Sequence, residues 1–303
     1  MKRTVLCVVE LENYPEDVVA RATELAKMHD CDLELVLSDP ASSYLGESFV
    51  MFAEMQMFAD TIRNEQEAML RSLAMPAEDL GIAVRTSTSH ERPEANMIAA
   101  RAQYCDALFV VKGTHHHSPT ERASMAHTDW QLIRKLECPL WFVKPGKWKT
   151  PVHVVAAVDP VHKHDKQANF DRKIIEYARD IANKYQGDLT LFHAYQRLEE
   201  IGAHVKWSFK PERLPVDKLD QEIRQEHNKA LQTLAKACDV AEGAIHQLPG
   251  RTEDLLPTFA RTNGASLVVM GALARSSLRK RILGSTAARA LDQLPCDVLI
   301  IHG

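Results

Sequence analysis

The residues whose types and spacing have the clearest chemistry lie in GALARSSLRKRILGST, residues 271–286. The stretch begins at Gly271 and ends with Gly284-Ser285-Thr286, and four basic side chains lie between these ends. Glycine lets a backbone approach an anion closely, and hydroxyl groups, arginines and the free N–H groups at a helix start all bind phosphate oxygens. The same pattern also fits a solvated connection whose serine or threonine caps a helix. Spacing alone leaves both interpretations open.

An acidic residue, Asp159, stands where it would complete a ligand site with this stretch. Asp159 follows the apolar run VVAAV and Gly271 follows LVVM, so each residue ends a predicted strand. In an open parallel sheet, ligands bind beyond the carboxyl ends of the strands, where the strand order reverses. With the order 3-2-1-4-5, that point lies between strand 1 and strand 4. The Asp159 carboxylate is suited to accept hydrogen bonds from a base or a ribose.

The two halves of the chain repeat one another. TVLCVVEL in the first half resembles HVVAAVDP in the second, which pairs Glu10 with Asp159. ALFVVKG resembles SLVVMG, which pairs Gly113 with Gly271, and from this point the halves align without gaps. Shared order, spacing and residue type indicate an internal duplication.

Each half has the pattern of five strands alternating with four helices. Short apolar, β-branched runs predict strands at 4–10, 33–38, 82–87, 107–112 and 139–143, and again at 152–158, 188–194, 244–248, 266–270 and 296–301. Stretches with helical periodicity predict helices at 16–29, 50–74, 93–103 and 119–136, and again at 168–186, 217–238, 252–262 and 283–294. This alternation predicts an α/β protein with two tandem, mainly parallel five-stranded sheets that are covered on both faces. We expect each sheet to be doubly wound, with strand order 3-2-1-4-5. The Pro- and Gly-containing segment KPGKWKTP marks the joint, so we expect domains over 1–146 and 151–303.

At these residues the sequence resembles the universal stress protein family, specifically its tandem-domain (E-type) members. The nucleotide motif of that family is G-x-x-G, nine residues, then G-[ST]. The segment from Gly271 to Ala274, followed by nine residues and Gly284-Ser285, matches it in length and at all but one position, because Ala274 replaces the second glycine. The resemblance implies Rossmann-like (HUP-like) domains and an adenine nucleotide, ATP, in the C-terminal domain only.

The resemblance also assigns roles to residues by position. Asp159 matches the acid that contacts the adenosine, and His193 and Ala194 end strand 2, where the backbone meets the base. The matched phosphate-loop positions are Gly271, Ala274, Gly284, Ser285 and Thr286, with Arg275 nearby to supply charge.

The first half departs much further from the motif. Gly113 is present, but the later positions hold His116, Ala126 and His127, and only Thr128 keeps its kind. Imidazoles in place of glycines would close a phosphate cradle. We therefore expect no nucleotide in the first half.

The densest group of histidines is His115-His116-His117, with His127 ten residues later. Adjacent histidines in a loop do not all face one ion, and no cysteine or acid stands at zinc-finger spacing. We interpret the group as solvated or structural and expect no metal, with a metal site as the alternative. The six cysteines form no C-x-x-C pair and are expected as reduced thiols in or near the core.

The stretch YLGESFVMFAEMQMFADTI is rich in Met and Phe. Phe52, Met55, Phe58 and Ile62 fall on or near one helical face, which predicts a buried face. An apolar ligand pocket or a dimer seam is the alternative.

Composition limits the function classes. The chain has 303 residues, a formal net charge of -4 and no apolar run near the length of a membrane helix, so we expect a cytoplasmic protein that neither binds nucleic acid generally nor inserts into a membrane. No P-loop, G-x-S-x-G or H-E-x-x-H signature is present, and no catalytic residue is assigned.

The leading hypothesis is a stress-response protein, not an enzyme, that binds an adenine nucleotide and acts through conformation or association. One alternative is a slow ATPase that uses Asp159 or a metal near Ser285. Another is a scaffold with vestigial sites, or a binder of an apolar molecule in the first half. The duplication further predicts a pseudo-dimer of the two halves within one chain, and leaves a homodimer of chains open.

Overall fold

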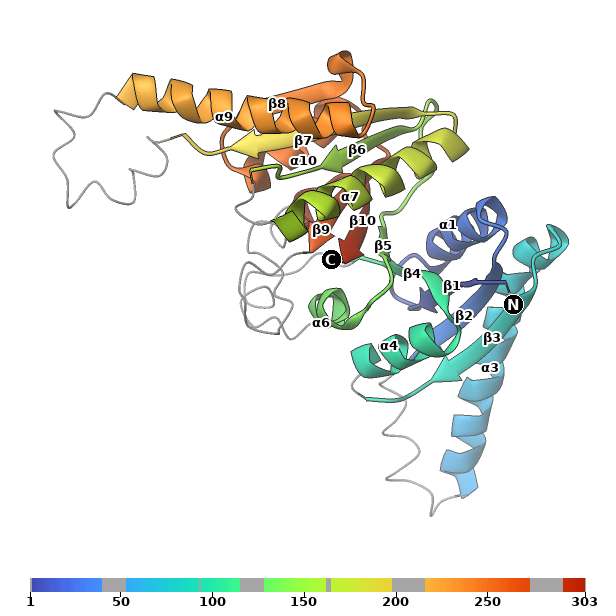
Figure 1. Ribbon diagram of the computed structural model, residues 1–303. Coiled ribbons are helices and arrows are strands. Elements are labelled where there is room, and N and C mark those ends of the chain that lie inside the picture. Colours follow the sequence, from blue (N-terminus) through green and yellow to red (C-terminus); the bar gives the residue numbers. More distant parts are fainter. Residues whose placement is uncertain are drawn as a thin grey trace, which may run out of the picture. The chain divides into compact units, whose positions relative to one another are not determined.

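The computed structural model describes residues 2–39, 53–92, 94–114, 128–161, 165–197, 216–272 and 291–302. The chain divides into two compact units, one containing Met1–Lys147 and the other beginning at Trp148 (Figure 1). The phosphate-loop positions Ala274, Arg275, Gly284, Ser285 and Thr286 lie outside the described residues, as do His115–His117 and His127.

The first unit is a parallel five-stranded sheet with helices between its strands. Its elements are β1 (Thr4–Val9), α1 (Pro15–Met28), β2 (Asp32–Ser38), α3 (Ala53–Asp79), β3 (Val84–Ser89), α4 (Glu94–Tyr104), β4 (Ala107–Gly113), α6 (Thr128–Lys135) and β5 (Leu140–Val143). The strand order is β3-β2-β1-β4-β5, and β1 pairs in parallel with both β2 and β4. This confirms the predicted order 3-2-1-4-5.

The second unit repeats this topology. Its elements are β6 (His153–Ala157), α7 (Asp165–Lys184), β7 (Asp188–Tyr195), α9 (Val216–Ala237), the short 3₁₀ helix η2 (Glu242–Ala244), β8 (Ile245–Pro249), α10 (Thr252–Thr262), β9 (Leu267–Ala272) and β10 (Asp297–His302). The strand order is β8-β7-β6-β9-β10, and β6 pairs in parallel with β7 and β9. The reversal of strand order therefore falls between β6 and β9, as the sequence predicted.

The central strands are mostly buried because helices cover both faces of a parallel sheet. All six residues of β1, TVLCVV, are buried. Pro15 begins α1, and Glu16 and Asp17 lie in its first turn, where the positive end of the helix dipole stabilises negative charge. The six cysteines are free, and burial raises the pKa of Cys7.

The Met- and Phe-rich part of α3 is not a buried face, which corrects the prediction for Phe58. Phe58 is 53% exposed and Met57 is 70% exposed, and the first buried residue of the described part of the helix is Gln66. The 27-residue helix is about 40 Å long, whereas the strands that it covers span about 20–23 Å. Its N-terminal half therefore extends beyond the sheet (Figure 1). Phe52 and the side chain of Met55 lie outside the described residues.

Candidate functional site

The strand-1 acid of the second unit lies at the predicted end of the sheet. Asp159 comes two residues after β6, where the N–H of Val158 donates to the carbonyl of Phe192 at 3.0 Å and continues the pairing with β7. The N–H of Asp159 donates to Oδ1 of Asp171, a buried residue of α7, at 3.3 Å. These contacts hold the half-buried Asp159 at the carboxyl end of β6.

Gly271 lies inside β9, where helix α7 packs directly on the strand. A Cβ at Gly271 would lie 2.7 Å from Cζ of Phe170 and 3.1 Å from Cδ1 of Ile174. Both side chains are buried in a close-packed interior, so they have little room to withdraw. Packing alone therefore accounts for a glycine here, a reason that the sequence pattern did not reveal.

His193, on β7, is buried and forms one half of a pair of imidazoles. Its Nδ1 lies 3.0 Å from the carbonyl oxygen of Val158, and its Nε2 lies 2.7 Å from Nδ1 of His227 on α9. The two rings are 18° from parallel, with centroids 5.0 Å apart, and the His227 ring also faces that of Tyr195. The pair joins α9 to the strand beside Asp159.

The protonation state of the pair follows from its partners. A carbonyl only accepts, so Nδ1 of His193 carries a hydrogen. Burial lowers the pKa of both His193 and His227, and the nearby charge of Asp159 opposes this shift in each. Both rings are therefore neutral at pH 7, and Nδ1–H of His227 donates to Nε2 of His193. The arrangement leaves Nε2 of His227 as the site for an added proton.

Ala194 follows His193 in β7 and pairs with Leu248 of β8. Because side chains alternate along a strand, the half-exposed Ala194 and the buried His193 lie on opposite faces. Sequence reasoning missed His227, because a single histidine in a polar helix carries no motif and only the folded chain brings it to β7.

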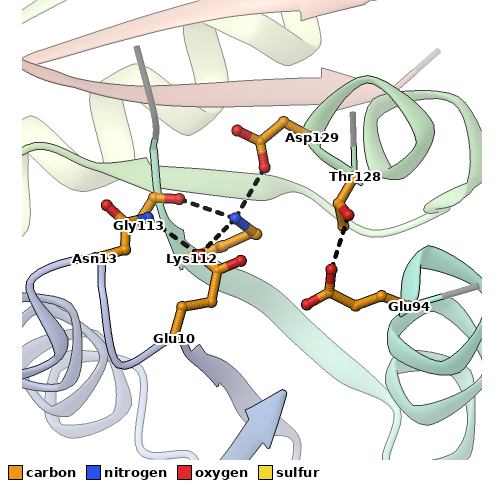
Figure 2. Close-up of polar contacts among 7 residues, drawn as sticks. All are labelled: Glu10, Asn13, Glu94, Lys112, Gly113, Thr128 and Asp129. Atoms are coloured by element: carbon orange, nitrogen blue, oxygen red, sulfur yellow. Dashed lines mark hydrogen bonds and ion pairs between the residues drawn. The ribbon is translucent and has the colours of Figure 1, made fainter. Parts of the chain in front are cut away.

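At the carboxyl ends of β1 and β4 in the first unit, side chains of the protein bind one another (Figure 2). The fully buried Lys112 of β4 places its Nζ 2.7 Å from Oε2 of Glu10 and 2.9 Å from Oδ1 of Asp129 on α6. The same Nζ donates to the carbonyl of Gly113 at 3.3 Å, and Nδ2 of Asn13 donates to Oε2 of Glu10 at 3.0 Å. Glu10, the counterpart of Asp159, is thus held by an ammonium and an amide.

The charges of this cluster stabilise one another. Burial alone would lower the pKa of Lys112, but the carboxylates of Asp129 and Glu10 outweigh burial and raise it, so the ammonium stays charged. A Cβ at Gly113 would lie 2.7 Å from Cγ of Asn13, which shows how closely that side chain covers the end of β4.

Thr128, the motif position that the first half retains in kind, contacts another helix. Its Oγ1 donates to Oε2 of Glu94, the first residue of α4, at 2.7 Å (Figure 2).

In the second unit the position of Lys112 is occupied by the buried Met270, which carries no charge. A lone lysine in an apolar, buried strand was the signal in the sequence for the Lys112 cluster.

Other candidate chemistry is limited within the described ranges. No group of three or more His, Cys, Asp or Glu residues there is placed to hold a metal ion. Likewise, none of the helices in the described part of the chain is both long and apolar enough to cross a membrane.

Comparison with known proteins adds the family. The sequence model of the universal stress protein family matches residues 1–144 and, a second time, residues 153–302. The chain belongs to the universal stress protein family. The two matches make it a tandem member, and its two units each carry the fold described above.

Two curated relatives and one solved structure illustrate the similarity. Universal stress protein E of Photorhabdus laumondii is 28% identical over 195 residues, which are 64% of this chain and 60% of that protein. The universal stress protein E homolog of Haemophilus influenzae is 26% identical over 207 residues, 68% of this chain and 65% of the relative. Each alignment thus spans less than two thirds of the relative. A putative universal stress protein from Pseudomonas aeruginosa UCBPP-PA14 shares the fold, with a TM-score of 0.73 at 22% identity over 99% of this chain and 93% of that one.

Proposed function

We propose that this stress-response protein binds one adenine nucleotide, ATP, in its second unit, at the carboxyl ends of β6 and β9. In this proposal Asp159 contacts the adenosine and the backbone of His193 and Ala194 borders the base. Gly271, Ala274, Gly284, Ser285 and Thr286, with Arg275, form the phosphate loop. All of these residues lie in the domain that we propose over 151–303, and the domain that we propose over 1–146 carries only a degenerate form of the motif.

The observation that carries the proposal is the contrast between the two units. In the first unit, Lys112 occupies the switch point and binds the strand-1 acid Glu10 at 2.7 Å. In the second unit, the uncharged Met270 stands at that position beside the strand-1 acid Asp159. The residue at the position of Lys112 therefore brings a positive charge to the first switch point and no charge to the second, which favours a charged ligand at the second.

The proposed role is binding, with a change in conformation or association as its output. No catalytic residue is assigned, because the sequence contains no P-loop, G-x-S-x-G or H-E-x-x-H signature. The alternative function is slow hydrolysis of ATP. Formation of ADP over hours in the presence of the full chain would support this alternative.

Calorimetric titration of ATP into the full chain tests the proposal. We expect saturable binding of one ATP per chain, weakened at least about tenfold in Asp159→Asn, because this change removes the charge-assisted hydrogen bonds of the carboxylate. Asp188→Asn, a change at the opposite end of β7, is the matched control and should bind like the parent. Absence of heat at millimolar ATP would overturn the proposal.

Mass spectrometry of small molecules released from the purified protein separates the remaining alternatives. Recovered ATP or another adenine nucleotide supports the proposal. An apolar molecule in its place would instead favour a pocket in the first half, and an empty protein that also fails to bind ATP would favour a scaffold with vestigial sites.

A further inference from the structure

A titratable group that the family motif does not contain lies beside the proposed site. His227 reaches from α9 to β7 and binds His193, whose other nitrogen binds the carbonyl of Val158, the residue before Asp159. One continuous chain of hydrogen bonds therefore runs from the backbone at the strand-1 acid to the half-exposed ring of His227.

The order of protonation in this chain is set by geometry. Nδ1–H of His193 donates to Val158, and Nε2 of His193 accepts from His227 at 2.7 Å. A first proton added at Nε2 of His227 leaves both hydrogen bonds in place and makes the second one charge-assisted. A second proton would place two N–H groups face to face and break the pair. His227 is therefore the ring that takes up one proton without disturbing the structure.

Within the described residues, the groups that face the two rings come from three elements and from the segment after β6, and some raise the pKa of the rings while others lower it. They are His193 and Tyr195 on β7, Asp159 after β6, Asp171 on α7 and Glu226 on α9. Burial keeps the pKa of His227 below its ordinary value, while the charges of Asp159 and Glu226 raise it. The ring is thus neutral at pH 7, and a further negative charge nearby would raise its pKa.

We propose that His227 is part of the ligand site of the second unit and takes up a proton when an anionic nucleotide binds. This inference rests on the proposed function. ATP would bring negative charge to the same end of the sheet, and negative charge near a neutral imidazole favours its charged form. By linkage, a ligand that promotes protonation binds more tightly as the pH falls.

The test compares the full-length protein with His227→Gln and His246→Gln by ATP titration calorimetry at pH 7.5, 6.5 and 5.5. Glutamine at 227 retains an N–H donor for His193 but does not titrate. His246, on β8 of the same unit with its ring against Phe259, is the matched control. Because ATP itself gains a proton in this range, the informative quantity is the affinity of each protein relative to His227→Gln.

We expect the affinity of the parent, relative to His227→Gln, to rise about three- to tenfold from pH 7.5 to 5.5, because protonation of His227 and binding of the nucleotide favour each other. Repeating the titration at pH 6.5 in two buffers of different ionisation enthalpy should show more proton uptake in the parent and in His246→Gln than in His227→Gln. Identical pH profiles and proton uptake in all three proteins would overturn the role of His227 while leaving nucleotide binding intact. Absence of ATP binding in the parent at every pH would overturn the proposed function and this inference with it.

Discussion

At the scale of single residues, the two units differ in the residue that stands next to the acid at the end of strand 1. The end of strand 1 carries an acid in both units, Glu10 and Asp159, and in the first unit the buried Lys112 pairs with Glu10. A buried ammonium between two carboxylates is costly to break, because removal of one partner leaves uncompensated charge in the interior. Lys112 therefore acts as a structural cation of the first unit.

Replacement of Lys112 by Met, the residue at the matching position of the second unit, should destabilise the first unit. We expect a loss of ~3–5 kcal/mol in the free energy of unfolding, since Asp129 and Glu10 lose their buried cation. Urea unfolding followed by hydrogen exchange of peptides from residues 2–39 measures it. Arg71→Gln, which removes an exposed pair with Glu67, should leave the midpoint nearly unchanged. An unchanged midpoint in Lys112→Met would contradict the structural role of the cluster.

At the scale of elements, the packing of α7 on β9 decides the identity of Gly271. The sequence pattern indicates a ligand role, whereas the folded chain shows Phe170 and Ile174 where a Cβ would stand. The same limit applies to α3, whose periodicity revealed an apolar stripe but not that the helix is longer than its strands. Side-chain pattern reports which face is apolar, and tertiary structure decides what covers it.

Gly271→Ala should cost about 1–3 kcal/mol of stability through overpacking against Phe170. The smaller ring-free side chain in the double variant Gly271→Ala/Phe170→Leu should recover part of this loss. Gly243→Ala is the matched control, because a Cβ there meets nothing within 4 Å. Chemical denaturation of the four proteins measures the effect, and equal stability of the parent and Gly271→Ala would refute the packing argument.

The contact between α9 and β7 predicts a pH dependence of stability. Burial lowers the pKa of His193 and His227 in the folded state, so the unfolded chain binds protons first as the pH falls. The stability contribution is fully present above the unfolded pKa of about 6.5 and is lost as the pH falls below it, towards the folded values. Urea midpoints of the second unit at pH 7.5 and 5.5 should differ less in His227→Phe than in the parent. An equal difference in both proteins would show that the pair does not contribute.

At the scale of the whole molecule, duplication made the topology predictable. The alternation of apolar runs and helical stretches predicted two mainly parallel sheets, because parallel strands covered by helices leave a strong sequence pattern. The expected strand order 3-2-1-4-5 was confirmed in both units. Of the proposed site, the sequence could place single residues relative to strands, with Asp159 after β6 and Gly271 in β9. Two contacts join residues that are far apart in the sequence: Lys112 with Asp129, and His193 with His227. Local spacing in the sequence predicts neither contact.

The two units are also the reason to expect one ligand per chain. One switch point contains an internal ammonium, and the other an uncharged Met270 beside Asp159. A crystal structure of the full chain grown with ATP tests this most directly. The account predicts ATP density at the carboxyl ends of β6 and β9, with Asp159 at the adenosine and Lys112 still bound to Glu10 in the first unit. Nucleotide bound at the first switch point, or none at the second, would contradict it.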